Sequence, residues 1–136
     1  MSITKNKALI ERYFEEIWNQ GNLNVLNDLI GPEYINHSPG LPDPAPGPEG
    51  LKPIVFSIRQ AFPDLQYRIK NMVVAADKVA VHTVMTGTHQ GDFFGVAATN
   101  NNIEVEQMQI ERIHCGQIVE HWRITDDATL MRQLSQ

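Results

Sequence analysis

The stretch from Gly116 to Asp127 holds the side chains that are best suited to acid–base chemistry. Two carboxylates, Glu120 and Asp126, stand there among large apolar residues. Burying a carboxylate as a charged group is costly, so an acid on an apolar face is seldom present for packing alone. An apolar environment also moves the pKa of an acid towards the range that proton transfer needs. Both carboxylates are therefore candidates for acid–base work.

The same stretch is predicted to form a strand that starts after a turn at Gly116. Because strand side chains alternate, one face is expected to carry Ile118, Glu120, Trp122 and Ile124. His121 is then expected on the opposite face, pointing outwards. Asp126 follows where the strand should end. Two alternatives remain open: Glu120 turns out to solvent at a β-bulge, or Asp126 simply caps the next helix.

Histidine and glutamine side chains supply further candidates. His37 stands where the helical part gives way to a loop, and imidazole is the usual proton carrier near neutral pH. His82 lies within an apolar strand, where a hydrogen-bonded structural role is the alternative. Gln107 and Gln109 share a face with Glu111, and their amides suit a ligand carbonyl or hydroxyl. For both glutamines, an open, solvent-facing sheet is the alternative.

The elements that must position these groups fall into two halves. Helices are predicted first: an apolar stripe from Leu9 to Trp18 that ends near Gly21, then residues 23–30 and 49–61. Phe14 and Trp18 are candidates for a pocket wall, with packing in the core as the alternative. Residues 38–50 hold five of the eight prolines, which predicts a loop that forms either a lid or the mouth of a site.

Strands are predicted from Leu65 onward, at 65–70, 78–87, 103–113 and 117–125, before a short helix at 128–134. Helices followed by antiparallel strands indicate an α+β domain, with one curved sheet and helices on its concave side. A length of 136 residues predicts a single domain, 1–136. Curved sheets of this kind often pair through their convex faces, so we expect a homodimer.

Composition narrows the classes of partner. The formal net charge of −5 argues against nucleic acid or an anionic membrane surface, because both attract basic patches. The sequence shows no signal-peptide pattern, no apolar run of membrane-spanning length and a single cysteine, so we expect a soluble cytoplasmic protein. Glycine-rich nucleotide loops and zinc-protease spacing are absent. The expected site uses no metal and no cofactor.

Three segments carry a resemblance to a known family: residues 87–96 (GTHQGDFFGV), residues 116–122 (GQIVEHW) with Asp126, and Gln133-Leu134. With Trp18-Asn19 at the end of the first helix, they resemble the SnoaL-like polyketide cyclases, or ester cyclases, of the NTF2-like superfamily. The resemblance covers nearly the whole chain. It implies a cone-shaped α+β barrel, in which a strongly curved, antiparallel or mixed sheet wraps around N-terminal helices and encloses a deep apolar pocket.

The resemblance also implies a chemistry. In the cyclases, an aspartate at the position of Asp126 is the general acid/base of an intramolecular aldol ring closure, without metal or cofactor. We therefore expect a cyclase-like enzyme with Asp126 and His37 as catalytic residues, acting on a small apolar or aromatic carbonyl compound. The expected substrate-binding residues are Phe14, Trp18, Tyr34, His82, Gln107, Gln109, Glu120 and Trp122. A binding protein without turnover, or a hydrolase or isomerase that uses the same aspartate, are the alternatives.

Overall fold

The computed structural model describes residues 2–40 and 44–136. Residues 41–43, within the predicted proline-rich loop, lie outside this part. The helical elements are α1 (Ile3–Arg12), the π-helix η1 (Tyr13–Asn19), the 3₁₀ turn η2 (Leu23–Val25), α2 (Leu26–Leu29), α3 (Pro48–Ala61) and α4 (Asp127–Leu134). The strands are β1 (Ile30–Asn36), β2 (Gln66–Ala75), β3 (Lys78–Thr88), β4 (Asn102–His114) and β5 (Gln117–Thr125).

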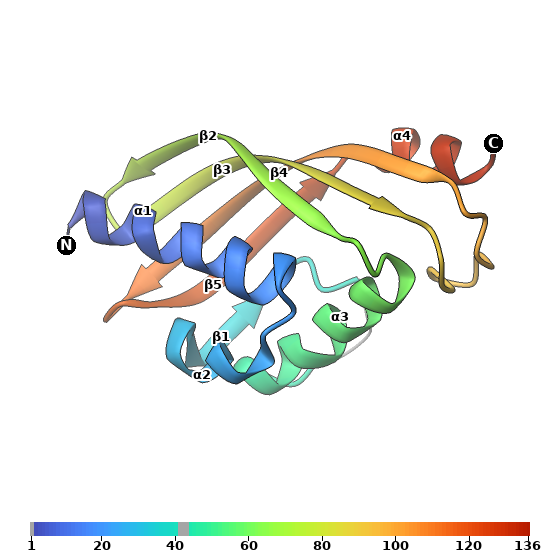
Figure 1. Ribbon diagram of the computed structural model, residues 1–136. Helices are drawn as coiled ribbons and strands as arrows, with labels where there is room; N and C mark the ends of the chain where they lie inside the picture. The colour runs from blue at the N-terminus through green and yellow to red at the C-terminus, as the bar shows by residue number, and fades with distance from the viewer. Residues whose placement is uncertain (1, 41–43) are drawn as a thin grey trace.

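The strands form one mixed sheet in the order β1-β5-β4-β3-β2, which curves around α1, η1 and α3 (Figure 1). We call the concave, helix-covered side the inner face and the convex side the outer face. The apolar stripe predicted for the first helix packs into the inner face: Ile10, Phe14 and Ile17 are at most 2% exposed. The predicted α+β architecture, with the sheet wrapped around N-terminal helices, is confirmed.

The end of η1 is fixed to both neighbouring layers. The side chain of Asn19 bonds to the backbone N–H and carbonyl of Tyr67 on the edge strand β2, at 2.6 and 3.1 Å. The guanidinium of Arg59 in α3 donates to the carbonyls of Trp18 and Asn19, at 2.6 and 3.0 Å. Carbonyls at the end of a helix lack intrahelical donors, and Arg59 supplies them here. These bonds hold Trp18 in a defined place between the helices and the sheet.

Strand β1 was not predicted. The second predicted helix, 23–30, ends at Leu29, and Ile30–Asn36 instead pairs in parallel with β5. The Gly31-Pro32 pair indicated a stop, but proline is tolerated on an edge strand, where a missing N–H costs little. The added strand brings His37 next to β5, where its backbone N–H donates to the carbonyl of His121 at 2.8 Å.

A β-bulge in β5 decides which of its side chains point inwards. Ile113 pairs with Ile118 and Arg112 pairs with Glu120, which leaves Val119 as the extra residue. One extra residue reverses the alternation of everything that follows. Ile118 is therefore buried on the inner face, whereas Glu120, Trp122 and Ile124 lie on the outer face. Glu120, Trp122 and Ile124 thus share a face as predicted, but Ile118 lies on the opposite one, and the alternative in which Glu120 turns outwards at a β-bulge is the one observed. The predicted outward orientation of His121, which is 2% exposed, is wrong.

Candidate functional site

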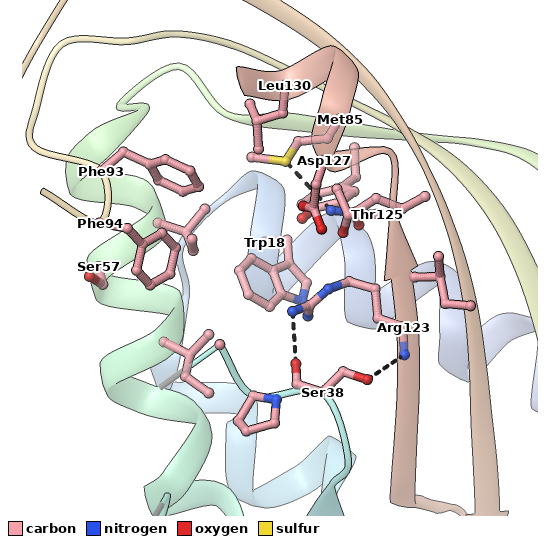
Figure 2. A pocket seen from close by; sticks show the side chains of 17 residues that line it. Trp18, Ser38, Ser57, Met85, Phe93, Phe94, Arg123, Thr125, Asp127 and Leu130 are labelled. Carbon is pink, nitrogen blue, oxygen red and sulfur yellow. Dashed lines mark hydrogen bonds between the residues drawn. The ribbon is translucent and has the colours of Figure 1, made fainter. Parts of the chain in front are cut away.

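A cavity of about 460 Å³ lies between the inner face and the helices (Figure 2). This volume falls in the range of pockets that hold small organic ligands. Its apolar walls come from the helices, β3 and the loop that follows β3: Trp18, Ile54, Ile58, Met85, Phe93, Phe94 and Leu130. Residues Ser38 to Gly40, which follow β1 and His37, line a further part. Of the predicted aromatic wall, Trp18 lies at the cavity.

Polar side chains reach the cavity from the sheet side. They include Gln107 on β4. Arg123 and Thr125 on β5 and Asp127 at the start of α4 are labelled in Figure 2. Arg123 and Thr125 are on the inner face because the bulge moved them there, where they pair with Gln109 and Gln107. A ligand in the cavity therefore meets a carboxylate, a guanidinium and an amide opposite an aromatic wall.

Asp126 does not reach this cavity. Its carboxylate accepts hydrogen bonds from the backbone N–H and the hydroxyl of Thr129, at 3.2 and 2.6 Å, and it is the exposed N-cap of α4. These bonds from Thr129 lower the pKa of Asp126. The predicted placement in an apolar hollow is wrong. A capping side chain must fold back onto the first helical turn, and the next residue, Asp127, lines the cavity instead.

The two predicted glutamines form one hydrogen-bonded unit on the inner face. Gln109 donates to the amide oxygen of Gln107 at 2.9 Å and lies 3.4 Å from the hydroxyl of Thr83. The amide nitrogen of Gln107 lies 3.8 Å from the sulfur of Met85, at the cavity. Gln109 therefore orients Gln107 from behind, and the side chain of Gln107 also hydrogen-bonds to Tyr67, which lines the same cavity.

A buried chain of charged groups continues from the cavity into the core. The Glu111 carboxylate lies 2.5 and 2.8 Å from Nδ1 of His121, and Nε2 of His121 lies 3.4 Å from Nη1 of Arg123. Burial raises the pKa of Glu111, while His121 and Arg123 act in the opposite direction. Arg123 is also tied to Ser38, whose carbonyl accepts from Nη2 at 2.7 Å (Figure 2). The contact between Glu111, His121 and Arg123 was not predicted from the sequence.

Tyr34 and Phe14, both predicted to contact substrate, are buried in the core. Phe14 packs against Tyr67 with ring centroids 5.4 Å apart. The hydroxyl of Tyr34 is buried and has no hydrogen-bond partner within the described part of the chain. Burial raises the pKa of Tyr34 and of the neighbouring Tyr13, so both phenols stay protonated. Neither Tyr34 nor Phe14 lines the cavity.

The remaining predicted site residues lie on the outer face. His37 is 2.8 Å from the Glu120 carboxylate, and its ring stacks on Trp122 at 4.8 Å. His82 bonds to Glu106 at 3.0 Å and to Asn71 at 3.3 Å. The sheet separates these groups from the cavity, so the predicted convergence of His37, His82, Glu120 and Trp122 on one pocket is wrong.

Within residues 2–40 and 44–136, no group of three or more His, Cys, Asp or Glu side chains is arranged to hold a metal ion. In the same part of the chain, no helix has both the length and the apolar character needed to cross a membrane.

Comparison with known proteins agrees with the fold. Wild-type IdmH, described as a putative polyketide cyclase from Streptomyces antibioticus, is 31% identical with a TM-score of 0.82, over 96% of this chain and 99% of that one. TsrD from Streptomyces laurentii is 25% identical with a TM-score of 0.89, over 98% and 97%. AclR from Streptomyces galilaeus, described as a putative hydroxylase, is 28% identical with a TM-score of 0.84, over 98% and 83%.

No curated protein matches the chain. The family model described as SnoaL-like polyketide cyclase matches residues 8–134, which is nearly the full length. The resemblance expected from the sequence is thus confirmed: the chain belongs to the SnoaL-like polyketide cyclase family.

Proposed function

We propose that this protein is an acid–base enzyme of the cyclase type, which acts on a small aromatic or apolar carbonyl compound without a metal or cofactor. The supporting observation is the cavity itself, where one carboxylate, Asp127, shares the sheet-side wall with the donors Gln107 and Arg123. Carbonyl chemistry needs both a proton acceptor and donors for the developing oxyanion. The names of the similar structures include both cyclase and hydroxylase, so the fold alone does not define the reaction, and the proposal rests on the residues of the site.

In the proposed reaction, the Asp127 carboxylate removes a proton from the carbon next to a carbonyl. The electron pair of the broken C–H bond moves onto the carbonyl oxygen, and the amide N–H of Gln107 stabilises the enolate that forms. The enolate carbon then attacks a second carbonyl of the same molecule, which makes a C–C bond and an alkoxide. Asp127 returns its proton to the alkoxide. The aromatic wall around Trp18 excludes water from the enolate.

Exchange of carbon-bound protons tests this function without knowledge of the natural substrate. The purified protein is mixed with 2-tetralone in deuterated buffer, and the loss of α-proton signals is followed by NMR. We expect acceleration over the protein-free reaction, and a loss of about 100-fold or more in Asp127→Asn, because a positioned base typically contributes that much. Asp126→Asn is the matched control, since asparagine caps a helix as well as aspartate does. Equal rates in the two variants would refute the role of Asp127.

A second candidate function, a small-molecule-binding protein without turnover, is favoured by one observation. Asp126, which matches the family's catalytic aspartate, is exposed and occupied as a helix cap. In that case ligands bind in the cavity, but the wild-type protein does not accelerate α-proton exchange. A hydrolase or isomerase acting through Asp127 would instead be recognised from its products.

A further inference from the structure

We propose that the natural ligand of the cavity carries a carboxylate on an aromatic or apolar body, and that this carboxylate pairs with the guanidinium of Arg123. The inference rests on the proposed function, because it names the class of molecule that the same cavity would take. It concerns recognition of the ligand, a step that precedes any proton transfer.

The guanidinium of Arg123 has donors to spare. A guanidinium offers five N–H groups, of which one contacts His121 and one donates to Ser38. The others have no partner in the part of the chain that the structure describes. No carboxylate there lies within 4.0 Å of Arg123, whereas Arg112, on the neighbouring strand but on the outer face, is paired with Glu120. Arg123 thus presents an unpaired positive charge to the cavity.

The nearest buried acid does not neutralise this charge directly. The imidazole of His121 stands between Glu111 and Arg123, in contact with both. The carboxylate of Glu111 therefore does not contact the guanidinium, whose N–H groups remain available to a ligand. Asp127 lines the same cavity but forms no ion pair with Arg123.

The setting of Arg123 favours a carboxylate over other anions. The guanidinium is held between His121 and Ser38, and its planar fork matches the two oxygens of a carboxylate. Arg123 is the single basic side chain among the described residues of the cavity lining, which suits a singly charged group better than a phosphate dianion. Trp18 and Tyr67 line the cavity with Arg123, where an aromatic body attached to the carboxylate would pack.

Isothermal titration calorimetry with a matched pair of ligands tests the inference. The probes are 2-naphthoate and 2-naphthamide, which differ in charge but hardly in shape, titrated into the wild-type protein at neutral pH. We expect the acid to bind about 10- to 100-fold more tightly than the amide, the usual range for charge-assisted bonds in a partly dry site. Equal affinities for the two probes would overturn the inference.

Two arginine variants locate the effect. Arg123→Gln is expected to bind acid and amide alike, whereas Arg112→Gln, the matched arginine on the outer face, keeps the preference. An acid preference that persists in Arg123→Gln would also overturn the inference. The result is separable from the proposed function: acid preference without α-proton exchange refutes only the enzyme, and Asp127-dependent exchange without acid preference refutes only the carboxylate anchor.

Discussion

The two faces of the sheet each hold a glutamate–histidine pair. On the inner face, Glu111 and His121 are 0% and 2% exposed; on the outer face, Glu120 and His37 are 22% and 39% exposed. The contacts are of similar length, 2.5 and 2.8 Å. The same two residue types therefore form the same contact in two environments, one buried and one partly exposed to solvent.

The pKa values of the two carboxylates shift in opposite directions because their environments differ. Burial raises the pKa of Glu111, because a charge in the core loses its hydration. Hydrogen bonds from His37 and Arg112 lower the pKa of Glu120, which is partly exposed to water. A glutamate–histidine contact alone thus does not identify a functional group, and the side of the sheet on which it lies decides its behaviour.

The largest expected effect is on stability. Glu111→Ala should lower the free energy of unfolding by about 3–5 kcal/mol, because it leaves the buried imidazole of His121 without its acid. Glu120→Ala should cost less than about 1 kcal/mol, as for other exposed ion pairs. Urea unfolding of both variants measures the difference. Similar losses would mean that the two faces are energetically alike.

The outer face is expected to govern assembly. It exposes several large apolar side chains, Val73, Met108, Ile110 and Ile124, each more than 40% exposed. Contiguous apolar patches mark protein interfaces, so we expect a homodimer through this face. Replacing the cross-strand partners Met108 and Ile124 with lysine should convert the dimer to a monomer in analytical ultracentrifugation. Phe56→Lys, an exposed apolar position on α3, should not, and a monomeric wild type would exclude this interface.

A smaller effect is expected at Asp126, which lies outside both faces. Asp126→Ala should lower the melting temperature by a few degrees, because α4 loses its cap. Asp126→Ser should restore most of this loss, since serine also accepts from the helical N–H groups. Thermal unfolding followed by circular dichroism gives the comparison. A larger effect on ligand binding than on melting would show that Asp126 contributes to the cavity after all.

The smallest effect concerns pH. The lowered pKa of Glu120 contributes stability that is present above its ordinary value of 4.5 and is lost as the pH falls through the folded-state pKa. The raised pKa of Glu111 has the opposite sign: its ionisation costs stability above 4.5, and the cost disappears as the pH falls through the raised value. Glu120→Gln should therefore reduce the change of the free energy of unfolding with pH below about 4.5. Glu111→Gln should reduce that change above about 4.5.

Urea unfolding across a series of pH values measures both slopes. Each variant keeps the other glutamate, so the two profiles serve as controls for each other. If both variants changed the free energy of unfolding on the same side of pH 4.5, the pKa values of Glu111 and Glu120 would not be shifted in opposite directions.

Much of the fold could be predicted because its signals are local. The apolar stripe of the first helix and the helix predicted at 49–61, found as Pro48–Ala61, follow from spacing alone, and so do strands β3, β4 and β5. Strand β2 was predicted only at 65–70 and extends to Ala75. Two of the predicted site residues, Trp18 and Gln107, lie at the cavity. The parallel strand β1 escaped prediction because its partner, β5, lies more than eighty residues further along the chain.

The errors at the site have one main source. An uninterrupted hairpin around the turn at Cys115-Gly116 would place Glu111 opposite Glu120, with two like charges side by side. The bulge at Val119 instead places Glu111 opposite His121 and moves Arg123 to the inner face. A single inserted residue thus exchanged the predicted groups, Glu120 and Trp122, for groups that were not predicted.

The sequence by itself determined the helix and strand periods, the α+β class and the family, because these depend on residue types at short, regular spacings. Only the tertiary structure decided which carboxylate meets the cavity, which histidine is buried and which arginine is left unpaired. Those outcomes depend on which residues of β5 face inwards after its β-bulge, and on the first turn of α4. A shift of one residue in either place leaves the local pattern unchanged but turns each side chain to another environment.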